Sequence, residues 1–274
     1  MGFIGPNGAG KSTTMKILTG FLSPDSGEAF INGLNVKSNS LEIKRSIGYL
    51  PEHNPLYPEM YVVEYLEYVS KLYGEWTMDD GRWTMERVIE LTGLGKEKHK
   101  KIEALSKGYQ QRVGLAQAII HNPDVLILDE PTSGLDPGQI VEIRNLIVSL
   151  GKDKTILLST HLMQEVEAIC DRVIMINKGE IVADGLTGEI GSEKDKVSTI
   201  LLELDKIPDH ELLSKIDGVI KIKSLDENRL LIESDASKDI RPLLFSFAVE
   251  NGLTILSMQK KERRLEEVFR EFMN

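Results

Sequence analysis

A glycine-rich loop near the start of the sequence constrains the fold more than any other feature. Residues 5–13 read Gly-Pro-Asn-Gly-Ala-Gly-Lys-Ser-Thr, the pattern G-x-x-x-x-G-K-S followed by a second hydroxyl. Between a strand and a helix, such a loop turns its backbone N–H groups inward around phosphates, and a Cβ at its glycines would hold the backbone away. Phe3 and Ile4 end an apolar strand before the loop, and residues 14–18 continue as a helix. The sequence therefore predicts a nucleotide site in an α/β fold.

Two side chains of this loop have roles that follow from their chemistry. The Lys11 ammonium is expected to reach the outer phosphates, and the Ser12 hydroxyl is expected to hold Mg²⁺. The alternative is a glycine-rich surface turn. It would not explain why a strand precedes the loop and a helix follows it. The expected nucleotide contacts in this segment are Gly5, Pro6, Asn7, Gly8, Ala9, Gly10, Lys11, Ser12, Thr13 and Thr14.

Composition is that of an ordinary globular protein and argues against some partners. The chain has 274 residues, of which 41% are hydrophobic and 28% charged, enough for one large domain and a small one. A formal net charge of −10 argues against nucleic acid as the main partner. The single cysteine, Cys170, cannot form an internal disulfide, which suits a reducing cytosol. No apolar run approaches the roughly 20 residues that span a bilayer, so a membrane component would be a separate chain.

Hydrophobic patterning divides the chain into regions. Up to about residue 185, short apolar runs alternate with amphipathic segments, the rhythm of βαβ units on a parallel sheet. Strands are expected at 125–128 and 156–158, with a helix over 139–150 between them. Residues 58–122 are instead rich in Tyr, Glu and Leu, which predicts a helical lobe after a proline-containing hinge loop.

The rhythm changes beyond residue 190. The order of apolar and polar segments predicts βαββαβ, a small α+β domain of the ferredoxin-like type over residues 191–274. A final helix is expected to carry Leu265, Val268, Phe269 and Phe272 on one face. The expected elements are strand 198–204, helix 209–216, hairpin strands 219–225 and 229–233, helix 239–250 and strand 253–258.

A second landmark is an aliphatic strand that ends in two carboxylates. Asp129 and Glu130 directly follow the strand 125–128. Carboxylates at the end of a buried strand are costly unless a cation or a polar reaction uses them. With the phosphate loop present, we expect Asp129 to stand behind Ser12 in the Mg²⁺ shell and Glu130 to face the water that attacks the γ-phosphate. The alternative is a solvated strand end with two acids.

The third landmark is the segment 105–112, Leu-Ser-Lys-Gly-Tyr-Gln-Gln-Arg. By itself it is a helix start capped by Ser106. Joined to the two motifs above, it resembles the signature sequence of ATP-binding cassette (ABC) ATPases, where related members carry Ser, Gly, Gly, Gln. Ser106 and Gly108 are kept, whereas Lys107 and Tyr109 depart from that pattern.

Further landmarks of this family follow in order. Residues 133–136, Ser-Gly-Leu-Asp, resemble the D-loop, and His161 after an aliphatic strand resembles the switch histidine that contacts the γ-phosphate. The likeness covers residues 1 to about 190 and implies a P-loop NTPase of the ABC ATPase type, with a RecA-like parallel sheet and a helical lobe. It implies ATP hydrolysis by Glu130, His161 and Lys11, and adds nucleotide contacts at Glu52, Ser106, Gly108, Gln110 and Asp136. The other histidines, His53, His99, His121 and His210, are interpreted as structural.

One departure concerns the metal. Where the family has a glutamine after residues 47–51, this chain has Glu52. Either side chain offers an oxygen to Mg²⁺, but a carboxylate cannot donate a hydrogen bond and adds negative charge near phosphate. Our hypothesis is that Glu52 keeps the metal-sensing role, so the expected Mg²⁺ ligands are Ser12, Asp129 and Glu52.

The resemblance also implies partners. In the family, two cassettes sandwich two ATP molecules across a two-fold axis, because the signature helix of one completes the phosphate site of the other. It implies a homodimer at the cytoplasmic face of the inner membrane and a separate transmembrane permease that docks near residues 52–61. Four tyrosines lie near this hinge, and packing in the lobe's own core is the alternative for most of them: Tyr57, Tyr61, Tyr65 and Tyr68.

A narrower likeness is to ABC-2-type exporters. Residues 47–57 and 265–269 resemble subunits of that branch, in particular those associated with bacterial gliding motility. The alternative is a non-transport ABC ATPase acting on a soluble partner; such members usually fuse two cassettes or insert long coiled coils, and this sequence has neither. A GTPase or kinase would lack the signature helix and the D-loop. A purely regulatory binding module would not release phosphate.

The short segment before the phosphate loop is a further departure. Family members carry a longer N-terminal segment, with an aromatic side chain that stacks on adenine, whereas four residues precede Gly5 here. We therefore expect a fragment or a mis-assigned start. Such a chain should bind ATP less tightly, because base stacking contributes roughly 1–3 kcal/mol in comparable contacts. It should also expose a sheet edge that promotes aggregation.

Overall fold

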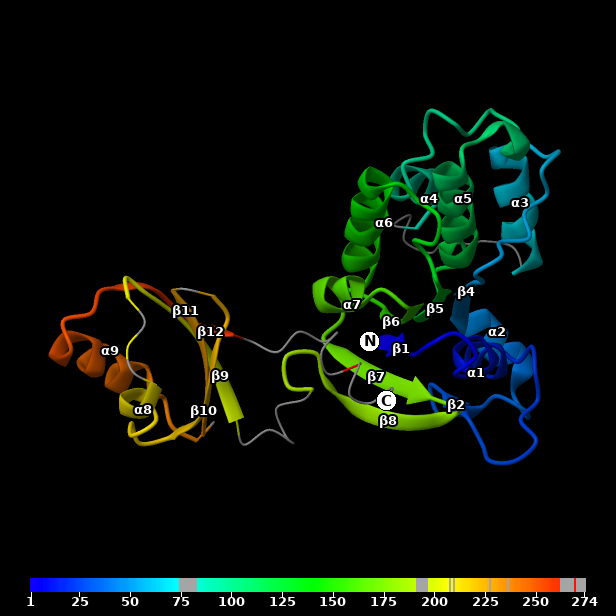
Figure 1. Cartoon of the computed structure of the whole chain (residues 1–274). Helices are drawn as coiled ribbons and strands as arrows, with labels where there is room; N and C mark the ends of the chain where they lie inside the picture. Colours follow the sequence, from blue (N-terminus) through cyan, green and yellow to red (C-terminus); the bar gives the residue numbers. More distant parts are fainter. Residues whose placement is uncertain are drawn as a thin grey trace. The chain divides into compact units, whose positions relative to one another are not determined.

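Two compact units make up the chain in the computed structural model, Met1–Gly188 and Glu189–Asn274 (Figure 1). The expected boundary, between residues 190 and 191, lies close to this division. Each unit has its own cluster of buried apolar side chains. The structure describes residues 1–73, 83–190, 197–206, 208, 210–226, 228–235, 237–261 and 269.

A six-stranded sheet with the order β4-β5-β6-β1-β7-β8 forms the centre of the first unit. All neighbouring strands are parallel except β7 and β8. The carboxyl ends of the parallel strands therefore meet at one edge, where loops from distant parts of the sequence come together. The strands are β1 (Gly2–Ile4), β4 (Ile47–Leu50), β5 (Val125–Asp129), β6 (Thr155–Thr160), β7 (Arg172–Asn177) and β8 (Glu180–Leu186).

Helices and a short hairpin complete this unit. The segment expected to form a helical lobe contains α3, α4, a short 3₁₀ turn and α5. None of the helices in the described ranges has both the length and the apolar character needed to cross a bilayer. The elements are α1 (Lys11–Leu18), β2 (Phe30–Ile31), β3 (Leu34–Asn35), α2 (Ser40–Ser46), α3 (Val62–Leu72), α4 (Met85–Leu91), η1 (Ile102–Ala104), α5 (Lys107–Ile119), α6 (Pro137–Leu150) and α7 (Met163–Ile169).

The expectation of a parallel sheet up to residue 185 is wrong for its last strand. β8 pairs antiparallel with β7 across a tight hairpin turn. The turn residues Lys178 and Gly179 both have positive φ, 49° and 84°. Positive φ at both central residues is typical of the two-residue turns whose backbone twist matches that of the flanking hairpin strands. A lysine rarely adopts this conformation. In the sequence, therefore, only Gly179 indicated a turn of this type.

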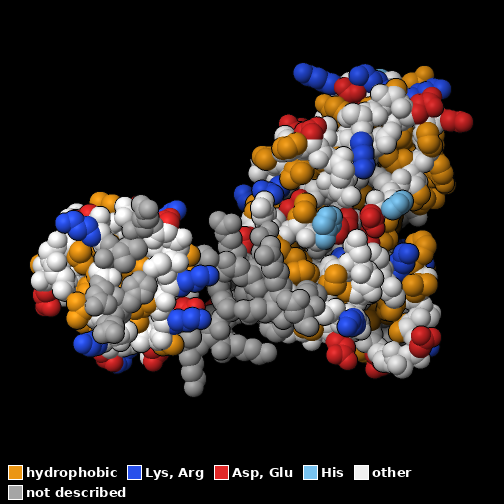
Figure 2. All heavy atoms as spheres, viewed as in Figure 1, with side chains coloured by type: hydrophobic (Ala, Val, Ile, Leu, Met, Phe, Trp, Pro, Cys, Tyr) orange, Lys and Arg blue, Asp and Glu red, His pale blue; other side chains and the backbone are white. Residues whose placement is uncertain are grey.

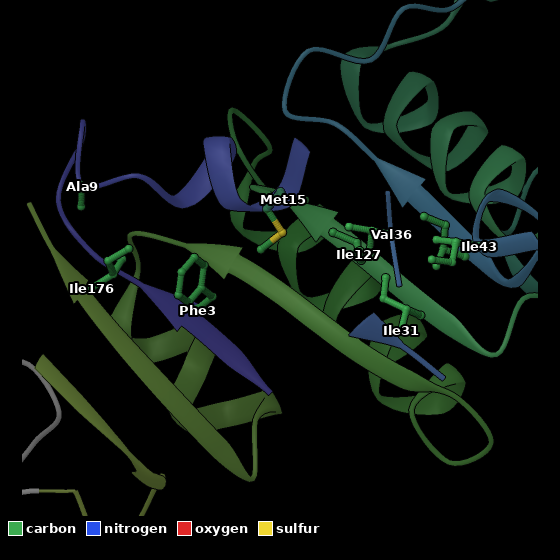
Figure 3. Close-up of a cluster of buried hydrophobic side chains, with 9 residues drawn as sticks. Phe3, Ala9, Met15, Ile31, Val36, Ile43, Ile127 and Ile176 are labelled. Carbon is green, nitrogen blue, oxygen red and sulfur yellow. The ribbon is translucent and has the colours of Figure 1, made fainter. Parts of the chain in front are cut away.

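Alternation along β1 shows which helices cover the two faces of the sheet. Phe3 belongs to a buried cluster with Met15 of α1 and Ile127 of β5 (Figure 3). A Cβ on the preceding residue, Gly2, would point the other way and lie 2.8 Å from Val166 of α7. Because successive side chains of a strand face opposite sides, α1 and α7 cover opposite faces. The central strands are accordingly apolar on both faces.

Glycines let α5 lie close to β4 and to the loop that follows it. A Cβ on Gly48 would lie 1.9 Å from the carbonyl oxygen of Ala118, and one on Gly114 would lie 1.9 Å from the Asn54 side-chain nitrogen. That nitrogen also donates a hydrogen bond to the carbonyl of Gln110 at 3.3 Å. The segment after β4 is therefore anchored to α5.

An antiparallel sheet with the order β10-β11-β9-β12 forms the second unit. Its elements follow the expected order βαββαβ. Alternate residues of β9 and β11, including Ile200, Leu202, Leu230 and Ile232, form the core with Leu244 of α9. The elements are β9 (Val197–Leu204), α8 (His210–Leu213), β10 (Val219–Ser224), β11 (Arg229–Asp235), α9 (Arg241–Glu250) and β12 (Ile255–Lys261).

Some expected boundaries in this unit differ from the structure. The helix expected over 209–216 ends at Leu213, because the chain turns there before β10. The strand expected over 253–258 is shifted towards the C-terminus and ends at Lys261. The final helix falls largely outside the described residues. Of its four apolar positions only Phe269 is described, in helical conformation.

Candidate functional site

A cavity of about 410 Å³ lies at the edge of the sheet where β1, β4, β5 and β6 end. Its lining comes from four separate parts of the sequence, which the parallel strand order brings together. Figure 2 shows acidic and histidine side chains gathered in the middle of this unit, between its helices and its strand-rich part. The lining residues are Asn7, Gly8, Gly10, Lys11, Ser12, Thr13, Glu52, Glu130, Ser133 and His161.

The glycine loop wraps tightly at the start of α1. Gly8 and Gly10 have φ values of 80° and 110°, which only glycine adopts without strain. A Cβ on Gly5 would lie 2.4 Å from the carbonyl oxygen of Ile176. No side chain caps the first N–H groups of α1, which follows Gly10 directly. Uncapped N–H groups at a helix start bind anions, so this loop can hold phosphate oxygens.

The Lys11 side chain folds back onto the first residues of the loop. Its side chain is buried, and its Nζ donates hydrogen bonds to the carbonyls of Gly5 at 2.8 Å and Pro6 at 3.3 Å. The hydrogen bonds that this buried ammonium makes go only to neutral carbonyls, so it forms no direct ion pair. A phosphate in the cavity would give Lys11 a charged partner at hydrogen-bond distance.

Glu130 and His161 face each other across the cavity. The His161 Nδ1 lies 2.8 Å from Glu130 Oε2, and the histidine ring is 54% exposed while the carboxylate is buried. Glu130 has a φ of 51°, a left-handed conformation that costs a non-glycine residue about 1–3 kcal/mol. Burial raises the pKa of Glu130, and the hydrogen bond and charge of His161 oppose that rise, as does the nearby Lys11. Strain and a raised pKa at one carboxylate are typical of a functional group.

Asp129 lies directly before Glu130 and is buried at the end of β5. Its Oδ1 has no hydrogen-bond partner, which is costly for a buried acceptor. Oxygen donors from Ser12, Glu52 and Asp129 suit a hard cation such as Mg²⁺. Across the described ranges, no group of three or more His, Cys, Asp and Glu side chains could hold a metal ion alone. An ion here would therefore take further ligands from phosphate and water.

The remaining expected nucleotide contacts do not line this cavity. Ser106 caps α5 and accepts a hydrogen bond from the Tyr109 N–H at 3.4 Å, while Asp136 caps α6 and accepts one from the Gln139 N–H at 2.9 Å. A Cβ on Gly108 would lie 2.5 Å from the Gln139 side chain, so the two helix starts pack together.

Several expected contacts act instead within their own segments. Gln110 donates from Nε2 to the carbonyls of Ile102 and Leu105, at 3.1 and 3.4 Å. The Thr14 hydroxyl donates to the carbonyl of Gly10 at 3.0 Å. The Ala9 N–H donates to the carbonyl of Pro6, which supports the loop from behind. The carbonyl of Gly5 holds Lys11, as described above.

Two residues near the cavity were not among the expected contacts. Ser133 lines it, and its N–H donates to the carbonyl of Glu130 at 3.1 Å. Buried Gln111 donates from Nε2 to the carbonyl of Pro131 at 2.8 Å, which connects α5 to the residue after Glu130. Both lie inside motifs recognised in the sequence, but only the tertiary contacts distinguish them from their neighbours.

Comparisons with known proteins identify the family of this chain. The family model described as ABC transporter matches residues 1–133. The linearmycin resistance ATP-binding protein LnrL of Bacillus subtilis is 31% identical over 98% of this chain and 87% of its own length. The bacitracin transport ATP-binding protein BcrA of Bacillus licheniformis is 34% identical over 98% of this chain and 86% of its own length. The dimeric structure of MJ0796, a bacterial ABC transporter cassette, is 26% identical with a TM-score of 0.60, over 68% of this chain and 84% of that one.

Proposed function

This chain belongs to the ATP-binding subunits of ABC transporters, and from that premise we propose that it powers an ABC-2-type exporter. As a member of the family it binds ATP and couples ATP hydrolysis to transport. The observation that carries the ATPase part of the proposal is the cavity in which the uncapped phosphate loop meets the Glu130–His161 pair.

Each residue of the cavity has a distinct task in this proposal. The loop amides and Lys11 bind the β- and γ-phosphates, so that negative charge is balanced before reaction. Glu130 accepts a hydrogen bond from the attacking water and orients it in line with the γ-phosphate. His161 holds Glu130 from the opposite side and contacts the γ-phosphate. Water adds to the γ-phosphorus as the bond to the β-phosphate oxygen breaks, which releases ADP and phosphate.

We propose that Ser12, Asp129 and Glu52 face a magnesium ion bound with the nucleotide. The unpartnered Oδ1 of buried Asp129 and the position of Ser12 and Glu52 in the cavity lining support this assignment. A bound Mg²⁺ would neutralise charge that develops on the phosphate oxygens. The carboxylate of Glu52 adds a negative charge that the usual glutamine would not, which should tighten the dependence on Mg²⁺.

We propose a homodimer, supported by three expected nucleotide contacts that do not line the cavity of their own chain. Ser106 and Gly108 sit at the start of α5, with Asp136 beside them at the start of α6. We propose that this surface, with Gln110 as its support, completes the phosphate site of a second copy. The dimeric structure of MJ0796 supports such an arrangement. ATP would hold the two copies together, and hydrolysis would release them.

A membrane subunit is proposed to dock where the loop after Glu52 meets α3. Tyr57, Tyr61 and Tyr68 are exposed there, whereas Tyr65 is buried and donates a hydrogen bond to Gln117. The Tyr57 ring lies 5.8 Å from that of Tyr65 and 5.9 Å from that of Tyr68, so the exposed patch is anchored to the core. Core packing thus explains Tyr65, and the exposed rings support docking to a permease at the cytoplasmic membrane face.

The direction of transport and the role of the second unit belong to the same proposal. The names of BcrA and LnrL, bacitracin transport and linearmycin resistance, support export over a non-transport role. The gliding-motility subgroup stays a prediction.

We assign residues 191–274 to a ferredoxin-like domain, supported by the strand order β10-β11-β9-β12 with antiparallel neighbours. Residues 1–190 with their helical lobe at 58–122 form the nucleotide-binding domain in this proposal.

Replacing Lys11 tests the function directly. Lys11→Ala should weaken ATP binding by at least about tenfold and abolish phosphate release, because a charged hydrogen bond to phosphate contributes about 1.5–3 kcal/mol. Lys16→Ala removes the same charge from the exposed side of the same helix and should change neither quantity. Calorimetry with Mg-ATP and a phosphate-release assay measure both. Equal ATP affinity in the parent and Lys11→Ala would contradict the proposed site.

A further inference from the structure

Glu165 is a buried carboxylate on α7 to which the proposed hydrolysis gives no role. The residue is 2% exposed. Its Oε2 accepts a hydrogen bond from the Thr160 hydroxyl at 3.1 Å, and its Oε1 has no partner. A carboxylate buried with one oxygen unpartnered destabilises the fold relative to an apolar side chain of the same size. Packing alone therefore does not explain this residue.

Glu165 and Thr160 together hold the turn that follows β6. The Thr160 hydroxyl donates to Glu165 and accepts a hydrogen bond from the Leu162 N–H at 3.1 Å. The Glu165 N–H donates in turn to the carbonyl of Leu162 at 3.0 Å. Both backbone groups of Leu162 are thus tied to this pair, which leaves the intervening residue, His161, on a turn of defined shape.

The position of His161 depends on this turn. Its ring is 54% exposed, so surrounding side chains do little to hold it. The Nδ1 nevertheless lies 2.8 Å from Glu130 Oε2, a geometry that requires the backbone beneath it to be correctly placed. The contacts therefore form a connected path from Glu165 through Thr160 and the turn to His161 and Glu130.

We infer that Glu165 is a positioning residue for ATP hydrolysis, which fixes His161 against Glu130 through the hydroxyl of Thr160. The inference rests on the proposed function, since it assigns Glu165 to the reaction at that site. Glu165 touches neither nucleotide nor water in this assignment. It sets the geometry of the histidine that does.

Substitutions at Glu165 separate positioning from stability. Glu165→Met removes both acceptor oxygens at similar volume and should lower kcat about tenfold with KM little changed, because misplacing a catalytic group by a fraction of an ångström has effects of this order. Its melting temperature should be no lower than that of the parent. Glu165→Gln keeps an acceptor for Thr160 and should restore most of kcat. Glu167→Met, on the exposed side of α7, is the matched control and should leave kcat unchanged.

Thr160 and His161 complete the kinetic test. Thr160→Val removes the bridging hydroxyl and should reproduce the loss in Glu165→Met, while Thr160→Ser should not. In a His161→Ala background, Glu165→Met should cause no further loss, because the group that it positions is absent. An equal loss in both backgrounds, or a kcat that follows the melting temperature through the series, overturns the inference.

A measurement without turnover keeps the inference separate from the proposed function. The ring resonances of His161 in nucleotide-free full-length protein, assigned with His161→Gln, report its environment by NMR. Glu165→Met and Thr160→Val should shift them, and Glu167→Met should not. A parent protein that releases no phosphate would refute the proposed function, and these resonances would still decide the inference. Resonances unmoved by both substitutions overturn it.

Discussion

Glu130 combines a strained backbone and a perturbed ionisation at one residue. Its φ of 51° places a non-glycine residue in the left-handed region, directly after β5. Burial raises the pKa of its carboxyl, and the His161 hydrogen bond is the largest of the effects that oppose the rise. This residue lines the cavity together with Lys11, and strained residues cluster at functional sites of this kind.

The direction of this pKa shift predicts how activity depends on pH. In the role proposed for it, Glu130 orients water only when it is ionised, so hydrolysis should fall on acidification at a pH above the ordinary glutamate pKa of 4.5. His161→Ala removes the hydrogen bond and the electrostatic interaction that lower the pKa of Glu130. The acid limb of the remaining activity should therefore move to still higher pH. Profiles of kcat against pH for both proteins measure this, and coincident acid limbs would contradict it.

A second titrating group affects stability instead of activity. The His121 ring stacks on Tyr73 at 3.8 Å, and its Nε2 lies 2.9 Å from the carbonyl of Ile47, which makes Nε2 the donor. Burial is the main cause that lowers the pKa of His121, from 6.5 to about 4. The structural interpretation of this histidine agrees with these contacts.

Sensitivity to acid is the expected consequence of His121. Between pH 6.5 and about 4 the unfolded chain binds the proton more readily than the folded one, so stability should fall as pH falls through this window. His121→Phe keeps a ring against Tyr73 but cannot titrate. Its melting temperature should therefore decline less over the same window. Thermal unfolding at several pH values compares the two slopes, and parallel slopes would rule out His121 as the cause.

At the scale of elements, the contact between α5 and β4 depends on a glycine in the strand. The Cβ of Gly48→Ala would lie 1.9 Å from the carbonyl oxygen of Ala118, a backbone atom that cannot swing away. We expect a loss of about 1–3 kcal/mol or more of unfolding free energy, the usual cost of overpacking. Gly95→Ala has no atom within 4 Å of its Cβ and should change stability by less than about 0.5 kcal/mol. Urea unfolding of both variants provides the comparison, and equal midpoints would contradict the packing argument.

The first residues of α5 and α6 pack against each other in this structure. Gln139 packs on Gly108, and Gln111 donates to the carbonyl of Pro131. Pro131 follows Glu130 directly, so these contacts connect the residue after Glu130 to the surface that we propose faces a second copy. Coupling of hydrolysis to dimer opening has a physical route through these contacts.

At the scale of the whole molecule, the cavity and the signature surface of one chain are separate, which predicts dimerisation on ATP. Glu130→Gln keeps the shape of the site but removes the carboxylate that we propose orients water, so ATP should persist and the dimer should accumulate. Light scattering should report twice the monomer mass with Mg-ATP and the monomer mass with Mg-ADP.

Ser106 provides the control for this dimer. Adding Ser106→Arg to Glu130→Gln should prevent association and leave ATP binding intact, because Ser106 lies outside its own cavity. A monomer for Glu130→Gln at saturating Mg-ATP would contradict the dimer. Loss of ATP binding in the double variant would instead place Ser106 in its own chain's site.

Local patterns in the sequence were sufficient to predict the features that depend on interactions between residues close in sequence. The glycines of residues 5–10 encode a backbone shape, the aliphatic run before Asp129 encodes a buried strand, and period-two alternation encodes the strands of the second unit. These features depend on residues close in sequence, so the phosphate loop, the carboxylate pair and the βαββαβ order were all predictable.

Tertiary structure decided what depends on partners distant in sequence. The antiparallel β8, the exposure of Tyr57 and Tyr61, and the bond from Gln111 to Pro131 follow from how elements pack. The same holds for Glu165, whose carboxylate gains a role only because α7 places it beneath Thr160. The spacing of apolar residues indicates which side of a helix is buried. It does not indicate which group a buried polar atom will contact. That choice is made by the assembled sheet and the helices that cover it.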